Sequence, residues 1–408
     1  MKVGPGRLRP HVSVALGRRV VAFVLLLLFL VALTGCGRSP IPLSTVSSSA
    51  PATSLDTPGT TEPSPDPVLQ MVARMDTRQK VAQLLVVGFP GTVPTAELTR
   101  FLQEGPVGGV LLYGWNIESP EQLLALVSAL QQEAEAGASG VPLLVAVDQE
   151  GGDVRRIREG VPDVPGARAA ASTLSTDDVR DLSRRQAEAL LRLGVNTNLA
   201  PVADVVEDPS SFLYQRSYGG DPERVSGYVS AVVEGQEAAG LISVVKHFPG
   251  HGAATGDSHL GQALSTLGPE EFRAVHLRPF EAALRAGAPA VLVSHLVAEG
   301  LGETGPATLS TRVIEGLLRA ELGFAGVVMT DDMEMAGLPA GGAAAAEAVI
   351  AGADLVIVGH TGTEQRAALD ALVEAADSGR LPVARLDEAV ERVLRLKSEY
   401  GLLQPTVR

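Results

Sequence analysis

Residues 243–252 read Ser-Val-Val-Lys-His-Phe-Pro-Gly-His-Gly, a short apolar run that ends in polar side chains before a Pro-Gly turn. The run is β-branched and shows little of the alternation that a half-exposed strand would have. Such a strand is buried on both faces, which is typical of parallel sheets covered by helices. Residues 243–247 are therefore predicted to form a strand with Lys246 and His247 at its C-terminal end.

Seven further runs of this kind alternate with longer amphipathic stretches along the chain. The predicted strands are 81–87, 109–113, 143–147, 195–201, 290–295, 326–330 and 354–358, and the predicted helices include 121–135, 177–193, 222–239, 269–286 and 312–322. Eight strand–helix units over this length predict an α/β fold, a single (β/α)8 barrel of the TIM type. A doubly wound open sheet is the alternative that the pattern leaves open.

Polar residues collect where the predicted strands end. Along the chain these residues are Asp148, Asp204, Lys246-His247, Ser294-His295 and Asp331. Active sites of (β/α)8 barrels lie at the C-terminal ends of the strands. Because unpaired polar groups beside a buried strand cost free energy, five of them in the same register predict a functional site.

The N-terminal residues differ in composition from the barrel region. Residues 1–19 are basic, residues 20–33 are almost wholly apolar, and Leu33-Thr-Gly-Cys36 then resembles a bacterial lipobox around the only cysteine of the chain. The apolar run is shorter than the roughly 18 residues that indicate a membrane span. We expect residues 1–36 to be a lipoprotein signal peptide, with Cys36 as the lipidated N-terminus after cleavage. An ordinary signal peptide or an uncleaved anchor is the alternative.

Residues 37–68 are rich in Ser, Thr and Pro and are expected to be a flexible tether, which leaves residues 69–408 for the barrel domain. With one cysteine no disulfide can form within the chain, so the fold must depend on its core. The net charge of −14 argues against a nucleic-acid partner. We expect a monomer on the extracytoplasmic face of a bacterial membrane, in the cell envelope.

Three segments indicate the chemistry. Val245-Lys-His-Phe-Pro-Gly-His-Gly252 continues to Asp257-Ser-His259, Asp148-Gln-Glu-Gly-Gly152 leads to Arg156, and Val328-Met-Thr-Asp-Asp-Met333 ends the seventh strand. Together they resemble glycoside hydrolase family 3, and in particular its β-N-acetylglucosaminidase branch, over about residues 71–403. The resemblance implies a retaining exo-enzyme that hydrolyses terminal β-linked N-acetylglucosamine from cell-wall muropeptides or related glycans. It implies no metal and no organic cofactor.

Retaining glycosidases need a carboxylate nucleophile and a group that first donates and then accepts a proton. The family's motif places the nucleophile at Asp331. Since side chains alternate along a strand, we expect only one of Asp331 and Asp332 to face the barrel axis, with Asp332 in a supporting role. The resemblance assigns the acid/base to His259, and Asp257 is expected to orient its ring and stabilise its cation.

The resemblance also implies a set of sugar-binding residues: Asp148, Arg156, Arg216, Lys246 and His247. Asp148 is the best candidate for the outer hydroxyls of the terminal sugar, although each of these residues could instead belong to an ion pair at the barrel rim. The sequence departs from the branch at Asp153, where an arginine is common, and at Asp208-Pro-Ser-Ser-Phe-Leu-Tyr214. These departures concern the details of the subsites.

Other functions remain open on the sequence. A β-glucosidase-type or phosphorolytic member of the same family would share these motifs, since a histidine acid/base does not repel an incoming phosphate. A non-catalytic glycan-binding lipoprotein is the non-enzyme alternative. His247, His251 and His259 with Asp257 could also suggest a metal site, but Pro249 and Gly250 interrupt the helix that the H-x3-H spacing would need.

Overall fold

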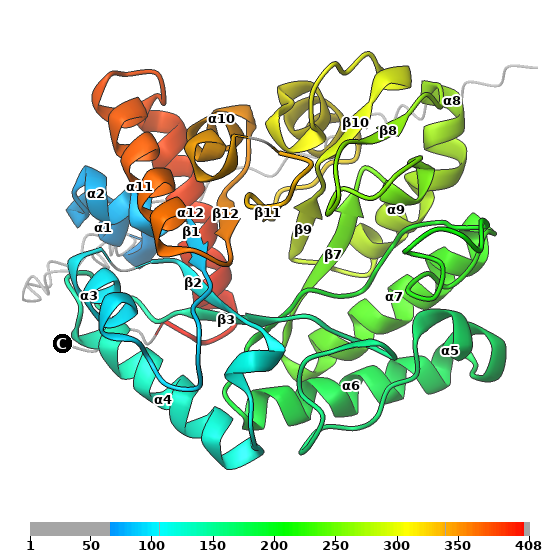
Figure 1. Cartoon of the computed structure of the whole chain (residues 1–408), viewed down its shortest axis with the longest axis horizontal. Helices are drawn as coiled ribbons and strands as arrows, with labels where there is room; N and C mark the ends of the chain where they lie inside the picture. The colour runs from blue at the N-terminus through cyan, green and yellow to red at the C-terminus, as the bar shows by residue number, and fades with distance from the viewer. Residues whose placement is uncertain (1–65, 106, 339, 404–408) are drawn as a thin grey trace, which may run out of the picture. The chain divides into compact units, whose positions relative to one another are not determined.

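In the computed structural model, which describes residues 66–105, 107–338 and 340–403, eight parallel strands form a closed barrel (Figure 1). They pair in the order β1-β12-β11-β9-β7-β6-β3-β2. Their bounds are Leu85–Val87 (β1), Gly109–Leu112 (β2), Leu144–Val147 (β3), Thr197–Asn198 (β6), Ile242–Phe248 (β7), Ala290–Val293 (β9), Val327–Asp332 (β11) and Leu355–Val358 (β12). Closure confirms the predicted (β/α)8 barrel, because an open sheet would leave two edge strands unpaired.

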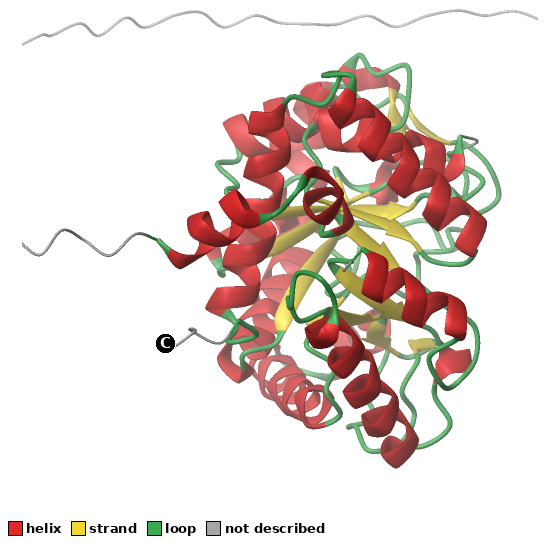
Figure 2. Cartoon of the chain, turned by 90° about the vertical axis from the view of Figure 1, so that its left-hand side faces the viewer, coloured by secondary structure: helices red, strands yellow, loops and turns green. Residues whose placement is uncertain are grey.

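Helices surround this barrel, as Figure 2 shows. Their bounds are Pro67–Arg74 (α1), Thr77–Ala82 (α2), Ala96–Glu104 (α3), Pro120–Ala136 (α4), Ala167–Thr173 (α5), Thr176–Arg192 (α6), Pro222–Ala239 (α7), Pro269–Glu271 (α8), Arg278–Arg285 (α9), Ala345–Ala351 (α10), Gly362–Asp377 (α11) and Val383–Glu399 (α12), with π-helical segments at Phe272–His276 and Arg312–Glu321. Two small sheets lie outside the barrel: β4 (Gln149–Gly151) pairs with β5 (Val154–Arg155), and β8 (Ala263–Ser265) pairs with β10 (Leu296–Ala298). No helix in the described part of the chain has the length and apolar composition needed to cross a membrane.

The strands separate two apolar layers. In β11, Val327 and Met329 belong to the cluster that fills the barrel, whereas Val328 belongs to the cluster between the barrel and the helices. The same division holds in β12, where Leu355 and Ile357 face inward. Both layers are buried, so the strand sequences lack a polar face, which is why they show no polar alternation.

Helix α12 closes the end of the barrel where the strands begin. Val393 and Leu396 of this helix belong to the interior cluster, together with first residues of strands such as Leu144 and Ile242. Helix α1 packs against α12 (Figure 1), and the Asp66 carboxylate that caps α1 accepts a hydrogen bond of 2.7 Å from Arg395. The first described residues therefore join the barrel at the end opposite to the strand tips.

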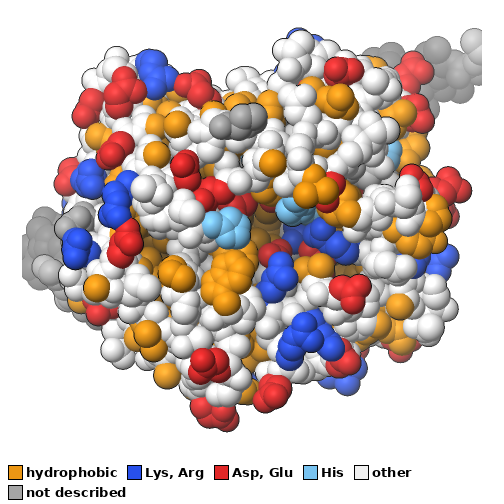
Figure 3. All heavy atoms as spheres, in the orientation of Figure 1, with side chains coloured by type: hydrophobic (Ala, Val, Ile, Leu, Met, Phe, Trp, Pro, Cys, Tyr) orange, Lys and Arg blue, Asp and Glu red, His pale blue; other side chains and the backbone are white. Residues whose placement is uncertain are grey.

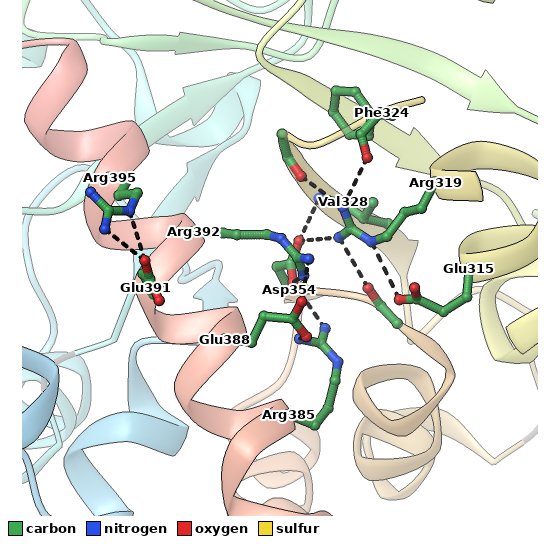
Figure 4. Close-up of polar contacts among 12 residues, drawn as sticks. Glu315, Arg319, Phe324, Val328, Asp354, Arg385, Glu388, Glu391, Arg392 and Arg395 are labelled. Carbon is green, nitrogen blue, oxygen red and sulfur yellow. Dashed lines mark hydrogen bonds and ion pairs between the residues drawn. The ribbon is translucent and has the colours of Figure 1, made fainter. Parts of the chain in front are cut away.

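A buried carboxylate connects the strands at the same end of the barrel to α12 and to the segment Arg312–Glu321 (Figure 4). Asp354, directly before β12, is fully buried and accepts hydrogen bonds from Arg319 (2.6 Å), Arg385 (2.9 Å) and Arg392 (3.2 Å). The backbone N–H of Val328 also donates to it, at 3.0 Å. Because Arg319 lies on the Arg312–Glu321 segment and the other two arginines on α12, this cluster ties both to β11 and β12.

The structure corrects several expected boundaries. Val81 was expected in the first strand but lies in α2, which begins after a capping box between Asp76 and Gln79. The expected strand 195–201 is reduced to the two residues of β6, and Pro201, which has no N–H to donate, lies beyond it. The expected helix 269–286 is divided into α8, a π-helical segment and α9.

The pattern did not predict either small sheet, because their strands have only two or three residues. Helix α1 begins at Pro67, two residues before the expected start of the barrel domain. The expected signal peptide, the expected lipidation at Cys36 and residues 37–65 of the expected tether lie outside the described residues.

We expect Asp354→Ala to lower the free energy of unfolding by about 3–5 kcal/mol, because removing one partner leaves buried charges unpaired. Urea unfolding followed by circular dichroism measures this loss. Glu374→Ala is the matched control, since Glu374 pairs with Arg380 at 2.8 Å with 65% of its side chain exposed, and exposed pairs contribute about 1 kcal/mol or less. Equal losses in the two variants would contradict the structural role of Asp354.

Candidate active site

A cavity of about 490 Å³ opens where the barrel strands end. It is large enough for a small carbohydrate, and Figure 3 shows a hollow on this face in which acidic, basic, histidine and hydrophobic side chains meet. Seven of the eight predicted catalytic and binding residues line the cavity: Asp148, Arg156, Arg216, Lys246, His247, His259 and Asp331. Asp257, the eighth, contacts the cavity through His259.

Lys246 is the centre of a buried charge network on one side of the cavity. It follows Ile242 and Val244 in the inward register of β7, and its ammonium lies 2.6 Å from Asp148 and 2.7 Å from Glu150. The guanidinium of Arg216 donates two hydrogen bonds to Glu150, at 2.8 and 2.7 Å. Two acids and two bases thus hold one another in fixed positions beside the pocket.

The protonation states of this network follow from its charge balance. Burial alone raises the pKa of Asp148 and of Glu150, but the positive charges of Lys246 and, at Glu150, of Arg216 outweigh burial and hold both pKa values below their usual range. Burial likewise lowers the pKa of Lys246, and the two carboxylates more than offset it, so the net shift is upward. All these groups are ionised at neutral pH, which suits them to orient hydroxyl groups by charge-assisted hydrogen bonds.

Arg156 and His247 line the cavity beside the charge network around Lys246. Arg156 lies 3.5 Å from the second oxygen of Asp148. The Nδ1 atom of His247 lies 2.7 Å from Asp204, which is fully buried and also accepts a hydrogen bond from the backbone N–H of Gly252 at 3.0 Å. One buried carboxylate therefore orients the His247 ring and fixes the start of the loop that leads to His259.

Asp331 and Asp332 end β11, and both line the cavity. Asp331 continues the inward register of Val327 and Met329, as expected for one carboxylate facing the barrel axis. The pairing with β12 shifts between Met329 and Asp332, and Asp332 also reaches the cavity lining, where we expected it in a supporting role.

The Asp332 carboxylate has several hydrogen-bond donors around it. It accepts hydrogen bonds from the hydroxyl of Tyr113 (3.1 Å) and from the backbone N–H groups of Glu334 and Gly359 (both 3.1 Å), and it pairs with His360 at 3.1 Å. Burial raises the pKa of Asp332, but these hydrogen bonds outweigh it and the net pKa is lowered. The hydrogen bond to Asp332 raises the pKa of His360. The Asp332 side chain thus has a structural role, because its contacts hold the residues around Asp331 in place.

His259 and Asp257 form a pair on the loop after β7. The Nδ1 atom of His259 lies 2.7 Å from Asp257, which also accepts the backbone N–H of His259 at 2.9 Å. Burial raises the pKa of Asp257, but these two hydrogen bonds outweigh it and the net pKa is lowered. The His259 side chain is 54% exposed and lines the cavity, so its Nε2 atom is available to a ligand while a carboxylate holds Nδ1.

The three histidines that suggested a metal site have separate partners: His247 with Asp204, His251 with Ser258 and His259 with Asp257. Among residues 66–105, 107–338 and 340–403, no group of three histidine, cysteine or acidic side chains is arranged to hold a metal ion. These hydrogen bonds connect the rings to Asp204, in the segment between β6 and β7, and to the loop after β7, and not to one another.

Sequence reasoning missed four residues of this site. Glu150 belongs to the segment Asp148-Gln-Glu-Gly-Gly152. Its contacts with both Lys246 and Arg216 depend on the β4–β5 turn. Tyr113, Trp115 and His360 follow β2 and β12 and also line the cavity. Their positions in the sequence could have indicated two of them, since Tyr113 ends a predicted strand and His360 comes two residues after the end of another.

The comparisons with known proteins all point to the same family. The sequence model of the glycosyl hydrolase family 3 N-terminal domain matches residues 76–396. The beta-hexosaminidase LpqI of Mycobacterium tuberculosis is 35% identical over 375 residues, which cover 88% of this chain and 92% of that protein.

Solved structures agree with the sequence comparison. A family 3 beta-N-acetylglucosaminidase from Paenibacillus superposes with a TM-score of 0.78 at 38% identity, covering 82% of this chain and 64% of that one. A beta-N-acetylhexosaminidase from Beutenbergia cavernae gives a TM-score of 0.74 at 32% identity, covering 80% of this chain and 99% of that one. The motifs at the strand ends, the closed barrel and these similarities agree: the chain belongs to glycosyl hydrolase family 3.

Proposed function

We propose that this glycoside hydrolase is a retaining exo-β-N-acetylglucosaminidase that removes terminal β-linked N-acetylglucosamine. The observation that carries the proposal is that Asp331 and the His259–Asp257 pair face one cavity, beside the charge network around Lys246. The names of the relatives, beta-hexosaminidase and beta-N-acetylglucosaminidase, support the choice of sugar.

The geometry supports a two-step displacement. In the first step a carboxylate oxygen of Asp331 attacks the anomeric carbon while the Nε2–H of protonated His259 gives its proton to the departing glycosidic oxygen. Asp257 stabilises the cationic ring through Nδ1–H and keeps Nε2 directed at the cavity. In the second step neutral His259 takes a proton from water, the water oxygen attacks the anomeric carbon, and Asp331 departs, so the product keeps its β configuration.

The shape of the site supports action at chain ends. The interior cluster and α12 fill the barrel below the cavity, so a glycan can enter only as far as the charge network at the strand tips. Asp148, Lys246 and Arg216 are the proposed ligands of the hydroxyl groups of the terminal sugar, with Arg156 and His247 beside them. A pocket closed at its lower end suits a terminal residue better than an internal one.

We further propose that the substrate is a cell-wall muropeptide or a related glycan and that Cys36 anchors the enzyme to the extracytoplasmic face of a membrane. The composition of residues 1–36 and the lipobox-like segment before Cys36 support the anchor. Labelling with a radioactive fatty acid tests it, because the native chain should incorporate the label and Cys36→Ala should not.

The choice of sugar is tested by release of nitrophenol from aryl β-N-acetylglucosaminide and from aryl β-glucoside in phosphate-free buffer. We expect kcat/KM for the acetamido sugar to exceed that for the glucoside by at least about 100-fold, because a site that bonds a polar substituent rejects the analogue that lacks it. Preference for the glucoside would move the protein to another branch of the family. Addition of phosphate should leave the product as free sugar, and formation of a sugar phosphate would instead indicate phosphorolysis.

Asp331→Ala is expected to lower kcat by at least about 1,000-fold, because no covalent intermediate can form without the carboxylate. Asp370→Asn, at an exposed position on α11 outside the cavity lining, is the control and should stay within about twofold of the native rate. An unchanged melting temperature shows that both variants are folded. Native-like turnover by Asp331→Ala would refute its role as nucleophile.

The acid/base role of His259 predicts a dependence on the leaving group. In His259→Ala, kcat for glycosides with poor leaving groups such as sugars should fall by about 100- to 10,000-fold, the usual contribution of general acid catalysis. Activated aryl glycosides need little protonation in the first step, so their loss should be clearly smaller. A comparison of nitrophenyl and alkyl glycosides measures this, and equal losses on both would count against proton donation by His259.

A further inference from the structure

One large aromatic residue at the mouth of the cavity has no part in the proposed chemistry. Trp115 is the only tryptophan of the 408-residue chain, and it stands 51% exposed in the short 3-10 turn Gly114–Asn116 that follows β2. Its indole N–H donates a 3.1 Å hydrogen bond to the carbonyl of Phe89. The polar edge of the ring is therefore satisfied by the protein, while its apolar surface stays half-exposed at the cavity.

The ring of Trp115 is held rigidly in place. It stacks on Tyr113 with ring centroids 4.4 Å apart and an interplanar angle of 14°. His360 lies against both rings, 5.0 Å from Tyr113 and 6.0 Å from Trp115. Tyr113 and His360 are in turn bonded to Asp332. We call Tyr113, Trp115 and His360 the aromatic shelf, which is thus connected to the residue next to the proposed nucleophile.

The strand order places the shelf on the side of the barrel away from Lys246. Tyr113 and Trp115 follow β2 and His360 follows β12, the two strands that flank β1. Strand β7, which carries Lys246 and precedes the His259 loop, lies across the barrel from β1 in the strand order. Asp148 follows β3, which neighbours β2, so the shelf lies beside Asp148 and across the cavity mouth from Lys246, and all of these groups line one cavity.

A second hollow adjoins the turn that carries Trp115. It measures about 310 Å³ and shares Gly114 and Arg156 with the main cavity. Gly114 is the residue directly before Trp115, so the turn that carries the indole lies between the two hollows. A ligand longer than one sugar has space to continue past this turn once its terminal residue occupies the main cavity.

We propose that the aromatic shelf is the subsite for the aglycone and that Trp115 stacks on the C–H face of a pyranose ring there. The proposal rests on the proposed function, because it takes the terminal sugar to be held at Lys246 and Asp148. A pyranose ring presents a flat array of C–H groups that covers an indole face and leaves its hydroxyls in water. The shelf thereby favours glycans over glycosides with small leaving groups.

The first test compares two substrates that share the terminal sugar. They are the β-1,4-linked disaccharide of N-acetylglucosamine, whose aglycone is a pyranose, and ethyl β-N-acetylglucosaminide, whose aglycone is too small to stack. In Trp115→Ala, kcat/KM for the disaccharide should fall about tenfold more than for the ethyl glycoside, the scale of one lost ring contact. Trp115→Phe keeps a ring and should recover most of the difference.

Equal losses on both substrates would overturn the proposal, because Trp115 would then serve the terminal sugar or the fold. If Trp115→Ala kept the native kcat/KM on both substrates, the proposal would be overturned as well. These outcomes differ from failure of the proposed function, in which the native enzyme itself would hydrolyse neither substrate.

A second test needs no turnover and no change at the shelf. Because Trp115 is the only tryptophan, the tryptophan emission of the inactive Asp331→Ala chain reports on this ring alone. Saturation with the disaccharide should shift the emission to shorter wavelength, since stacking removes water from the indole. Free N-acetylglucosamine, which occupies the terminal-sugar position, should produce a much smaller shift. Equal shifts with both ligands, or no shift at a disaccharide concentration that calorimetry shows to be saturating, would overturn the proposal.

Discussion

The arrangement of the site depends on one buried interaction, the contact of the Lys246 ammonium with Asp148 and Glu150. An ammonium buried at the end of β7 is costly unless acids surround it, and those acids come from the segment after β3. Glu150 then requires Arg216 as a second base. These pairing requirements bring the segments after β3 and β6 to fixed positions beside β7, where their charged groups are already paired.

Much of this site could be predicted because a closed barrel converts sequence position into spatial position. The inward register of β11 follows from the period of two, so Val327 and Met329 locate Asp331. The place of Asp332 could not be predicted, because it depends on a shift in pairing with β12 that no local pattern marks. Glu150 was missed for a similar reason, since the β4–β5 hairpin that positions it has strands of only three and two residues.

The boundary errors have local causes. Val81 is apolar and buried in either a helix or a strand, so its hydrophobicity could not decide between them, whereas the capping box at Asp76 did contain the information. The contact between the Tyr113 and His360 rings depends on closure of the barrel, because β2 and β12 both neighbour β1. Their ring contact could be inferred only after the barrel, and not an open sheet, had been established.

The junction of Asp66 with Arg395 on α12 has a practical consequence. Since α12 fills the end of the barrel where the strands begin, Asp66 itself lies at the end away from the cavity mouth. A solid support, a fused partner or a purification tag joined directly at Asp66 would therefore be attached away from the entrance. The same attachment through a loop at the strand tips would compete with the incoming glycan for space.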